Sequence, residues 1–350
     1  MSKGNINVAV IGASGYTGQE LLRLLMMHPN VNLVAVTSRK EAGRPLTDLY
    51  PRLRNAKGID GLTFSMPEVD LLVAAGVETA FLALPHGVAS EYAIALLEKG
   101  IRVIDLSADF RLRSAAVYEE FYGESHPAPH LLDEAIYGLP EIYRDDIKNA
   151  NLVASPGCYP TSILVPLIPL LKAGFVSSER ISVSSLSGVS GAGKKADVSL
   201  LFAEVNESLR AYGAPKHRHL SEIEQEMSFA SGKETVISFV PHLMPITAGI
   251  ASTIFCSPAE GLTSSQIETT LNDFYAASPF VRVLGEGVFP DTKNVVRTNF
   301  VDIGWVLDTR TGQLILCSAE DNLGKGAGGQ ALQSFNVMHN LDEATGLMNF

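Results

Sequence analysis

The first 110 residues alternate short apolar runs with amphipathic stretches. The apolar runs predict strands at 6–11, 32–38, 79–84 and 101–107, and the amphipathic stretches predict helices at 18–28 and 87–100. Alternation at spacings of roughly 25–35 residues is typical of βαβ units around a parallel sheet. We expect right-handed connections, with ligands at the carboxyl ends of the strands.

Beyond residue 110 the pattern is different. Residues 110–155 are rich in Tyr, His and Pro, and we expect irregular structure there. An apolar helix pattern follows at 159–174. Long stretches, several of them alternating, then predict strands at 181–188, 234–242, 248–257, 299–308 and 312–321. They favour a mixed, mostly antiparallel sheet.

This change of pattern predicts two domains, which a length of 350 residues also favours. The first is expected to contain residues 1–155 together with the C-terminal helix, residues 318–350, whose small residues suit packing against that domain. The second is expected to contain residues 156–317. The predicted fold class is therefore α/β, with a parallel sheet in the first domain and an α+β second domain.

Composition then narrows the possible partners. Apolar residues make up 46% and charged residues 19%, a balance typical of globular enzymes. The formal net charge of −11 argues against nucleic acid or an anionic membrane as partner, and an anionic substrate would need a local basic pocket. We expect neither a transmembrane helix nor a secretory signal. The 3 widely spaced cysteines favour a reducing cytoplasm.

A glycine-rich loop lies between the first predicted strand and the first predicted helix. The segment "VIGASGYTGQELL" has the spacing G-x-x-G-x-x-G, a variant of the dinucleotide fingerprint of Rossmann-type, doubly wound sheets. Its glycines allow a pyrophosphate to approach the backbone at a helix N-terminus. The alternative is that they only mark a turn. The expected cofactor contacts are Gly12, Ser14, Gly15, Tyr16, Thr17 and Gly18.

The end of the second strand predicts which dinucleotide binds. NAD-binding chains usually have an Asp or Glu there. Here the strand ends in Ser38, Arg39 and Lys40, which suit the 2′-phosphate of NADP, unless the two cations are simply solvated. His86, at the end of the strand at 79–84, is expected to face the cofactor region.

Cys158 lies between two prolines at the start of an apolar helix pattern. Unpaired backbone amides and the helix dipole favour a thiolate at such a position. Cys256 and Cys317 lie within strand patterns and are expected to be buried structural residues. A nucleotide domain together with a thiol domain suggests redox chemistry at the aldehyde level through a thioester.

The thiol needs an acid–base partner, and "PKHRHLSE" provides two candidates. His217 and His219 flank Arg218 just before a helix pattern. The two histidines could instead form half of a metal site, but no cysteine or carboxylate has suitable ligand spacing, so we expect no metal.

These segments resemble the N-acetyl-gamma-glutamyl-phosphate reductase family, which is related to aspartate-semialdehyde dehydrogenase. The resemblance covers nearly the whole chain and includes "GASGYTGQELLRLL", "FLALPHGVAS", "VIDLSADFRL", "YGLPE", "SPGCYPT", "SGVSGAGK", "HRHLSEIEQE" and "DNLGKGAGGQA". It implies a homodimer or homotetramer, the cofactor NADPH and a small-molecule acyl phosphate substrate. The implied reaction converts N-acetyl-gamma-glutamyl phosphate to the semialdehyde and phosphate. The first domain would bind NADP, and the second would provide catalysis and oligomerisation.

The resemblance also implies roles for individual residues. Cys158 would be the nucleophile and His217 the acid–base group, with His219 as the alternative. Ser107 and Arg111 would lie near the charged groups of the substrate. Further contacts to the cofactor would come from Ser190, Gly191, Gly193, Asn322 and Lys325.

One position departs from the family pattern. Relatives often have an arginine where this chain has Ala248, so Arg111, Lys216 or Arg218 would have to bind more of the substrate's charge. Two other interpretations stay open. One is a related enzyme acting on aspartyl phosphate or on a carrier-linked aminoadipyl substrate. The other is a non-catalytic NADP-sensing regulator.

Overall fold

The computed structural model describes residues 5–56, 58–59 and 61–348, and its chain divides into two compact units. The first unit contains the described residues as far as Pro156 and those from Ala327 onward. The second contains Gly157–Gly326. Residues 318–326, which we expected in the first domain, therefore belong to the second unit.

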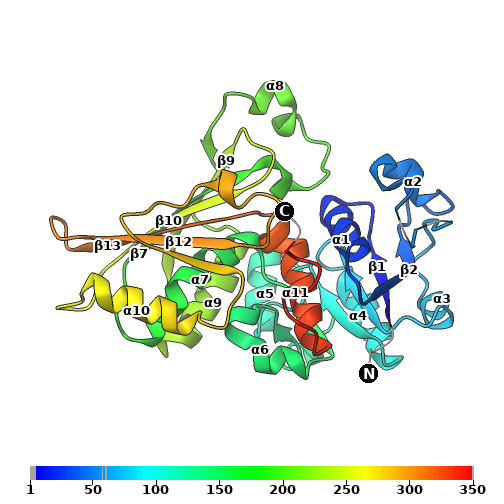
Figure 1. The fold of residues 1–350 in the computed structure, drawn as a ribbon, viewed down its shortest axis with the longest axis horizontal. Helices are drawn as coiled ribbons and strands as arrows, with labels where there is room; N and C mark the ends of the chain where they lie inside the picture. Colours follow the sequence, from blue (N-terminus) through cyan, green and yellow to red (C-terminus); the bar gives the residue numbers. More distant parts are fainter. Residues whose placement is uncertain (1–4, 57, 60, 349–350) are drawn as a thin grey trace. The chain divides into compact units, whose positions relative to one another are not determined.

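A parallel sheet forms the centre of the first unit (Figure 1). Its six strands have the order β2-β1-β3-β4-β6-β5, and every neighbouring pair is parallel. They are β1 (Ile6–Ile11), β2 (Val31–Thr37), β3 (Thr79–Leu82), β4 (Arg102–Asp105), β5 (Ile136–Tyr137) and β6 (Leu152–Ala154). The predicted Rossmann-type sheet is confirmed.

The helices of this unit connect its strands or follow them. They are α1 (Tyr16–Met26), α2 (Leu46–Leu49), α3 (Val69–Ala74), α4 (Ala89–Glu98), α5 (Ala115–Tyr122), α6 (Pro140–Lys148) and α11 (Gly329–Met338). The prediction of irregular structure over 110–155 was wrong, since α5, β5, α6 and β6 all lie there. The two strands have only two and three residues, too short for a clear hydrophobic period.

A mixed sheet of seven strands forms the second unit, in the order β11-β12-β13-β10-β7-β9-β8. The pairs β11–β12 and β7–β9 are parallel and the other four are antiparallel, as predicted. The strands are β7 (Ile181–Gly188), β8 (Arg210–Ala211), β9 (Ile237–Met244), β10 (Ile250–Cys256), β11 (Val281–Glu286), β12 (Val301–Asp308) and β13 (Gln313–Glu320).

Three long helices, α7 (Cys158–Lys172), α9 (His219–Ser231) and α10 (Ser264–Phe274), lie on one side of this sheet (Figure 1). Alternate residues of β10 point toward them and are buried, because α7 packs on that face. A fourth helix, α8 (Phe202–Val205), lies in the segment between β7 and β8. No described helix is both long and apolar enough to cross a membrane.

The end of the chain differs from the expected long helix. β13 continues to Glu320, because its last residues still pair with β10 and β12. A π-helical turn over Gly324–Gly328 then leads into α11. The glycines and the alanine within 324–329 therefore mark a change of unit rather than the face of one continuous helix.

Candidate active site

The glycine loop lies where the strand order reverses, because β2 and β3 flank β1 on opposite sides. Gly12 has φ +85°, and a Cβ on it would lie 2.4 Å from the carbonyl oxygen of Ala83. A Cβ on Gly18 would lie 2.7 Å from Cα of Ala13, so α1 packs closely on the loop. Gly15 has only the Gly12 oxygen within 4 Å of such a Cβ, at 3.9 Å. The turn, the open approach and the close packing required by a dinucleotide site are therefore all present.

The end of β2 provides polar groups beside this loop. Ser38 Oγ lies 3.0 Å from Ser14 Oγ. Arg39 is exposed, and its Nη2 donates to the Tyr92 hydroxyl at 2.8 Å. Glu41 is paired with Arg44 at 2.9 Å. These residues fit a nucleotide that carries an additional phosphate, since an exposed guanidinium occupies the position of the usual acidic residue.

Other predicted cofactor residues of this unit lie on its surface. Lys40, Tyr16 and His86 are exposed, while Thr17 is half-buried. His86 follows β3, and its ring centroid lies 5.4 Å from that of Tyr122. Sequence reasoning missed Tyr50, whose hydroxyl donates to the Ala13 carbonyl at 2.9 Å and so supports the glycine loop.

Ser107 and Arg111 belong to a buried network after β4. Burial, followed by the charge of Asp109, raises the pKa of Asp105 to about 7. Asp105 accepts hydrogen bonds from the Ser107 hydroxyl at 2.7 Å and amide at 2.9 Å. Arg111 is 8% exposed and donates to the carbonyls of Ser155 at 2.8 Å and Leu106 at 3.0 Å. In the structure Arg111 thus supports the backbone that leads to Cys158, and its contact with substrate stays a prediction.

Cys158 is the first residue of α7, and no side chain caps this helix end. The thiol lines a cavity of about 340 Å³ in the second unit and is half-buried. Burial raises the pKa of Cys256 to about 12 and also raises that of Cys317. Of the three cysteines, only Cys158 combines a helix N-terminus with a cavity, which is the setting of a reactive thiol.

Both candidate histidines line the same cavity. His219, at the start of α9, lies so close to the chain that a Cβ on Gly157 would be 2.6 Å from its Nε2. His217 accepts a hydrogen bond at Nδ1 from the His219 amide at 3.2 Å. Burial, followed by the charge of Arg218, lowers the pKa of His217 to about 4. His217 is therefore a neutral ring at physiological pH.

The second unit also supplies residues that sequence reasoning missed. The buried Glu222 accepts the Gly157 amide at 2.9 Å and so fixes the backbone before the thiol. Its position three residues after His219, on the same helix face, was the signal that could have found it. Tyr159 and Tyr212 pair their hydroxyls at 2.8 Å in the cavity wall.

The cavity wall is mainly cationic, although the chain as a whole is acidic. Its charged lining residues are Lys195, Arg210, Arg218 and Asp197, apart from the histidines and the thiol. Lys195 and Asp197 form an ion pair of 2.9 Å. Lys216, a candidate from the sequence, is exposed and does not line this cavity. The basic pocket that an anionic substrate requires is therefore present, with Lys195 and Arg210 as the residues that the sequence did not indicate.

The loop after β7 forms another part of the wall. Gly191 lines the cavity, and Gly193 has φ +71°. Ser190 accepts a hydrogen bond from Asn322 Nδ2 at 2.9 Å, and Asn322 Oδ1 accepts the Gly249 amide at 2.8 Å. Asn322 therefore joins two loops of this unit.

Ala248 packs its backbone against this loop. A Cβ on Gly188 would lie 2.9 Å from Cα of Ala248, and Gly188 itself lines the cavity. Ala248, where the family resemblance led us to expect an arginine, therefore lies next to the cavity wall.

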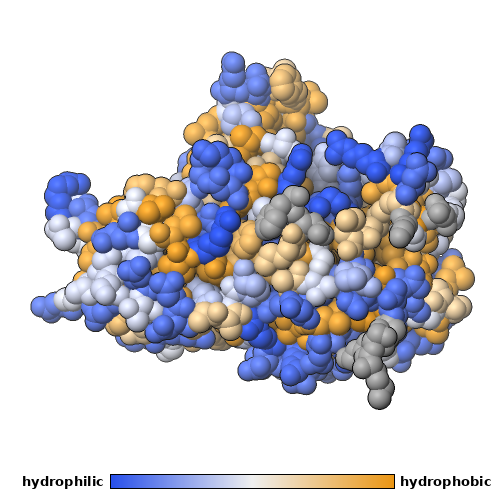
Figure 2. Space-filling model, viewed as in Figure 1, coloured by the Kyte–Doolittle hydropathy of each residue, from blue (hydrophilic) through white to orange (hydrophobic). Residues whose placement is uncertain are grey.

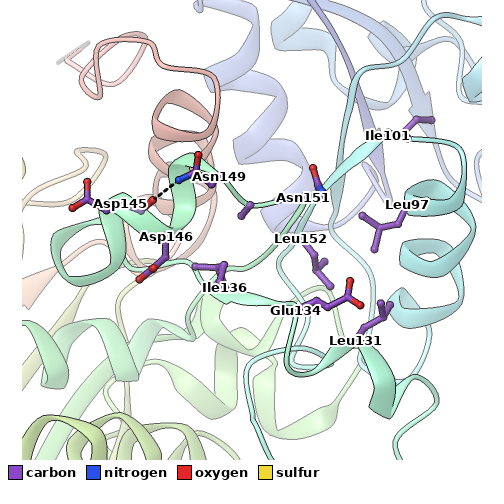
Figure 3. A pocket seen from close by; sticks show the side chains of 12 residues that line it. Leu97, Ile101, Leu131, Glu134, Ile136, Asp145, Asp146, Asn149, Asn151 and Leu152 are labelled. Atoms are coloured by element: carbon purple, nitrogen blue, oxygen red, sulfur yellow. Dashed lines mark hydrogen bonds between the residues drawn. The ribbon is translucent and has the colours of Figure 1, made fainter.

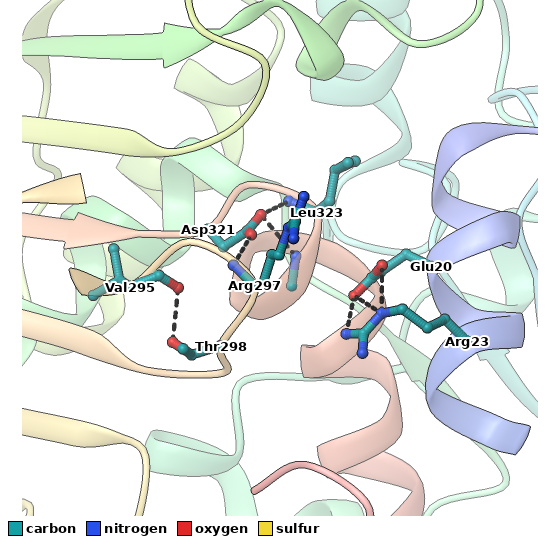
Figure 4. A network of polar contacts seen from close by, with 8 residues as sticks. Glu20, Arg23, Val295, Arg297, Thr298, Asp321 and Leu323 are labelled. Atoms are coloured by element: carbon teal, nitrogen blue, oxygen red, sulfur yellow. Dashed lines mark hydrogen bonds and ion pairs between the residues drawn. The ribbon is translucent and has the colours of Figure 1, made fainter. Parts of the chain in front are cut away.

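The segment that follows β13 is held by Asp321, which accepts the amides of Arg297, Leu323 and Gly324 (Figure 4). Lys325 is fully buried, with its Nζ 6.0 Å from the ring centroid of Phe280. The predicted contacts of Asn322 and Lys325 with the cofactor stay predictions.

A second cavity, of about 570 Å³, lies at the amino ends of β4, β5 and β6 (Figure 3). It contains none of the predicted site residues, and its charged side chains are Glu134, Asp145 and Asp146. An acidic cavity at this edge does not suit an acyl phosphate. No cluster of three potential metal ligands occurs within the described part of the chain.

Comparisons with known proteins agree with both the unit that contains the glycine loop and the unit that contains the thiol cavity. Residues 7–150 match the family model "Semialdehyde dehydrogenase, NAD binding domain", and residues 158–322 match "Semialdehyde dehydrogenase, dimerisation domain". Aspartate semialdehyde dehydrogenase II from Vibrio cholerae has a similar fold, with a TM-score of 0.71 at 20% identity over 96% of this chain and 99% of that one. Aspartate semialdehyde dehydrogenase with NADP from Candida albicans has a TM-score of 0.69 at 15% identity over 96% and 99%.

The fold and the thiol cavity thus define an oxidoreductase of the semialdehyde dehydrogenase class. The chain is 58% identical to the N-acetyl-gamma-glutamyl-phosphate reductase of Akkermansia muciniphila over 98% of both chains. It is 47% identical to that of Desulforapulum autotrophicum over 99% of both. The chain belongs to the N-acetyl-gamma-glutamyl-phosphate reductase family.

Proposed function

We propose that this chain uses NADPH to reduce N-acetyl-gamma-glutamyl phosphate to N-acetyl-L-glutamate 5-semialdehyde and phosphate, a step of arginine biosynthesis. The observation that carries the proposal is the position of Cys158 at the amino end of α7, in a cavity with a mainly cationic wall. Membership of the reductase family supports this substrate over an aspartyl or carrier-linked one. A thiol used in this way requires reducing surroundings, such as a cytoplasm.

Cys158 attacks the acyl carbon as the thiolate, which the amino end of α7 stabilises. A carbon–sulfur bond forms, and the bond to the phosphate oxygen breaks. Lys195, Arg210 and Arg218 stabilise the charge of the departing phosphate. The product of this first half is a thioester on Cys158.

NADPH, when bound, supplies the hydride that reduces this thioester. A histidine in the cavity then donates a proton to the oxygen of the thiohemiacetal that forms on Cys158. Breaking the carbon–sulfur bond releases the aldehyde and returns the thiol. Glu222 keeps the Gly157 amide in place, so that the backbone beside the reacting carbon does not move.

We assign the acid–base role to His219 in preference to His217, which the sequence had favoured. The ring of His219 lies against Gly157, directly before the nucleophile. His217 is a poor proton acceptor at neutral pH because burial and Arg218 lower its pKa to about 4. Its Nδ1 accepts the His219 amide, which suits a positioning role.

The cofactor proposal rests on the first unit. Gly12, Gly15 and Gly18 form the loop expected for a pyrophosphate, and Arg39 is exposed at the end of β2. NADP is preferred over NAD because a 2′-phosphate would meet the exposed Arg39 guanidinium there, while the nearby Glu41 carboxylate is paired with Arg44.

A homodimer or homotetramer is supported by the sheet of the second unit, in the segment that matches a dimerisation domain. Ala251, Thr253 and Phe255 of β10 alternate with its buried residues and are only half-buried. Their strand neighbours Cys317 and Ile315 on β13 are half-buried too. A sheet face of this kind suits burial against a second copy.

Turnover of Cys158→Ser is the direct test. We expect no NADPH oxidation with the acyl phosphate and near-normal NADPH binding, because a serine hydroxyl is not ionised at neutral pH. In the wild type, acid quenching and peptide mass analysis should place an acyl adduct on Cys158. Cys256→Ser is the control and should keep full activity. Activity that survives in Cys158→Ser but not in Cys256→Ser would refute the assignment.

A further inference from the structure

The strand pair β8–β9 turns three side chains toward the thiol cavity. Arg210 of β8 lies opposite Leu243 of β9. The Tyr212 amide continues this pairing by donating to the Pro241 carbonyl at 3.0 Å. Because alternate residues of a strand point to the same side, Arg210, Tyr212 and Leu243 share one face, and all three line the cavity. A ligand in the cavity therefore meets a guanidinium, a phenol and an apolar side chain together.

The Tyr212 hydroxyl belongs to a pair of phenols beside the nucleophile. It lies 2.8 Å from the hydroxyl of Tyr159, the residue that follows Cys158. The ring of His217 makes T-shaped contacts with both, with centroid distances of 5.7 Å to Tyr212 and 5.5 Å to Tyr159. Burial raises the pKa of both phenols, and the charge of Cys158 raises each further, so both keep their protons at neutral pH. A single contact between two hydroxyls uses only one of these two protons.

Tyr212 is the member of this pair that a ligand can reach. It is 37% exposed, whereas Tyr159 is 2% exposed. When Tyr159 donates to Tyr212, the proton of Tyr212 is left for an acceptor in the cavity. Tyr212 can therefore donate a hydrogen bond to an oxygen of the substrate.

The charges of the wall disfavour a substrate with an ammonium group. Among the described residues that line the cavity, Asp197 is the one carboxylate. It is already engaged by Lys195 at 2.9 Å and by the Ser199 amide and hydroxyl at 3.0 and 2.8 Å. A free α-ammonium would meet the cations Arg210 and Arg218 with that carboxylate taken. An acylated α-nitrogen carries no charge, and its acyl group adds a carbonyl oxygen that can accept a hydrogen bond.

The wall also has apolar surface for the remainder of an acyl group. Leu200 and Leu243 both line the cavity. Leu200 lies in the segment between β7 and β8, and Figure 2 shows apolar atoms beside hydrophilic ones over this segment, at the top of the view. A mixed surface of this kind suits an amide that carries a methyl group.

We propose that the Tyr212 hydroxyl donates a hydrogen bond to the amide carbonyl of the substrate's N-acyl group, with Leu200 and Leu243 beside the methyl group. Tyr212 is then a specificity-determining residue that favours an acylated α-nitrogen over a free amine. Tyr159 acts through Tyr212 and is a positioning residue. This inference rests on the proposed function, which places the acyl phosphate end of the same substrate at Cys158.

Oxidation of two semialdehydes tests the proposal in the purified full-length chain. NADP reduction with phosphate is measured for N-acetyl-L-glutamate 5-semialdehyde and for glutarate semialdehyde, which has the same chain and carboxylate but no acylamino group. Tyr212→Phe should lower kcat/KM for the acetylated aldehyde about fivefold to tenfold, mainly through KM, the usual effect of one lost hydrogen bond. The value for glutarate semialdehyde should change by less than about twofold. Partial unfolding lowers both values alike, so the ratio of the two decides.

Tyr159→Phe is the matched control, because it removes the partner hydroxyl and leaves Tyr212 its proton. It should change the ratio less than Tyr212→Phe does. An equal loss for both aldehydes in Tyr212→Phe would overturn the proposal, since a merely structural role, or a contact with the carboxylate, affects both substrates. A larger change of the ratio in Tyr159→Phe would overturn it as well.

Protection of Cys158 from alkylation keeps the test independent of turnover. The probes are N-acetyl-L-glutamate, glutarate and L-glutamate. In the wild type, N-acetyl-L-glutamate should protect at the lowest concentration and L-glutamate at the highest, and Tyr212→Phe should remove most of the advantage of the acetyl group. If the wild type oxidises neither aldehyde, the proposed function fails, and the order of protection still decides the role of Tyr212. Protection by N-acetyl-L-glutamate that is no better than protection by glutarate would refute that role.

Discussion

The glycine loop and the thiol cavity are built in different ways. The loop uses residues within a short stretch, Gly12 to Gly18, and recognises its ligand through backbone and a helix N-terminus. The cavity brings together α7, the loop after β7, the segment between β7 and β8 and the start of α9, which are far apart in the chain. Backbone recognition needs only local geometry, whereas a charged pocket in an acidic chain needs side chains from several segments.

Alanine variants of the two histidines test how the thiol cavity works, and we expect the largest effect on turnover from them. His219→Ala should lower turnover by about 10²–10⁴-fold, because the acid–base group is lost. His217→Ala should cost clearly less, since we assign His217 a positioning role in which its ring accepts the His219 amide. Steady-state rates and the pH dependence of Cys158 alkylation measure both variants. The reverse order of effects would restore His217 as the acid–base group.

Alanine substitutions at two glycines test how the glycine loop is built. Gly12→Ala should lower the free energy of unfolding by about 2–4 kcal/mol, because φ +85° is strained and the methyl group would overlap the Ala83 carbonyl. Gly15→Ala should change stability by less than about 1 kcal/mol and still weaken NADPH binding, because its methyl group would occupy the open approach. Urea unfolding and NADPH fluorescence titration separate the two effects. Equal loss of stability in both variants would contradict the division of roles within the loop.

The preference for NADPH over NADH tests whether the end of β2 belongs to the same dinucleotide site as the glycine loop. Arg39→Ala should weaken NADPH binding by about 1–3 kcal/mol, the usual size of a charged hydrogen bond, with little effect on NADH. Tyr92→Phe removes only the hydroxyl that Arg39 contacts, and so it is the matched control. kcat/KM for both cofactors measures the preference. A wild type that uses NADH as efficiently as NADPH would show that Arg39 is a solvated surface residue.

The smallest effect that we expect is on the pH dependence of stability, to which the half-buried ring of His217 contributes. Its pKa is about 4 in the folded chain, below the ordinary 6.5, so between these values the unfolded chain binds a proton that the folded chain does not. Stability should therefore fall as the pH drops from 6.5 to 4, by about 1–2 kcal/mol after screening. His217→Gln should flatten the pH dependence of Tm in this window. The exposed His130→Gln should not, and equal slopes in both variants would contradict the burial effect.

Much of the first unit followed from the sequence. The strands β1 to β4 and the glycine loop were predicted because buried parallel strands are apolar throughout and glycine spacing is local. The interval 110–155 was not, since β5 and β6 have only two and three residues and the Tyr-, His- and Pro-rich composition was interpreted as irregular structure. The end of β13 was missed for a different reason. Its final residues are ordered by pairing with β10 and β12, and no local signal marks this.

In the site, Cys158 was visible because its position at a helix start is a local property. The tertiary structure decided the rest of the cavity. It brought Lys195 and Arg210 into the wall of the cavity that the thiol lines, placed His219 against Gly157 and bonded Glu222 to the Gly157 amide. It also turned Arg111 toward the carbonyls of Leu106 and Ser155. The sequence by itself determined the chemistry of the residues, because that depends on side-chain type and local backbone. Which of them meet depends on long-range packing, and only the folded chain decides that.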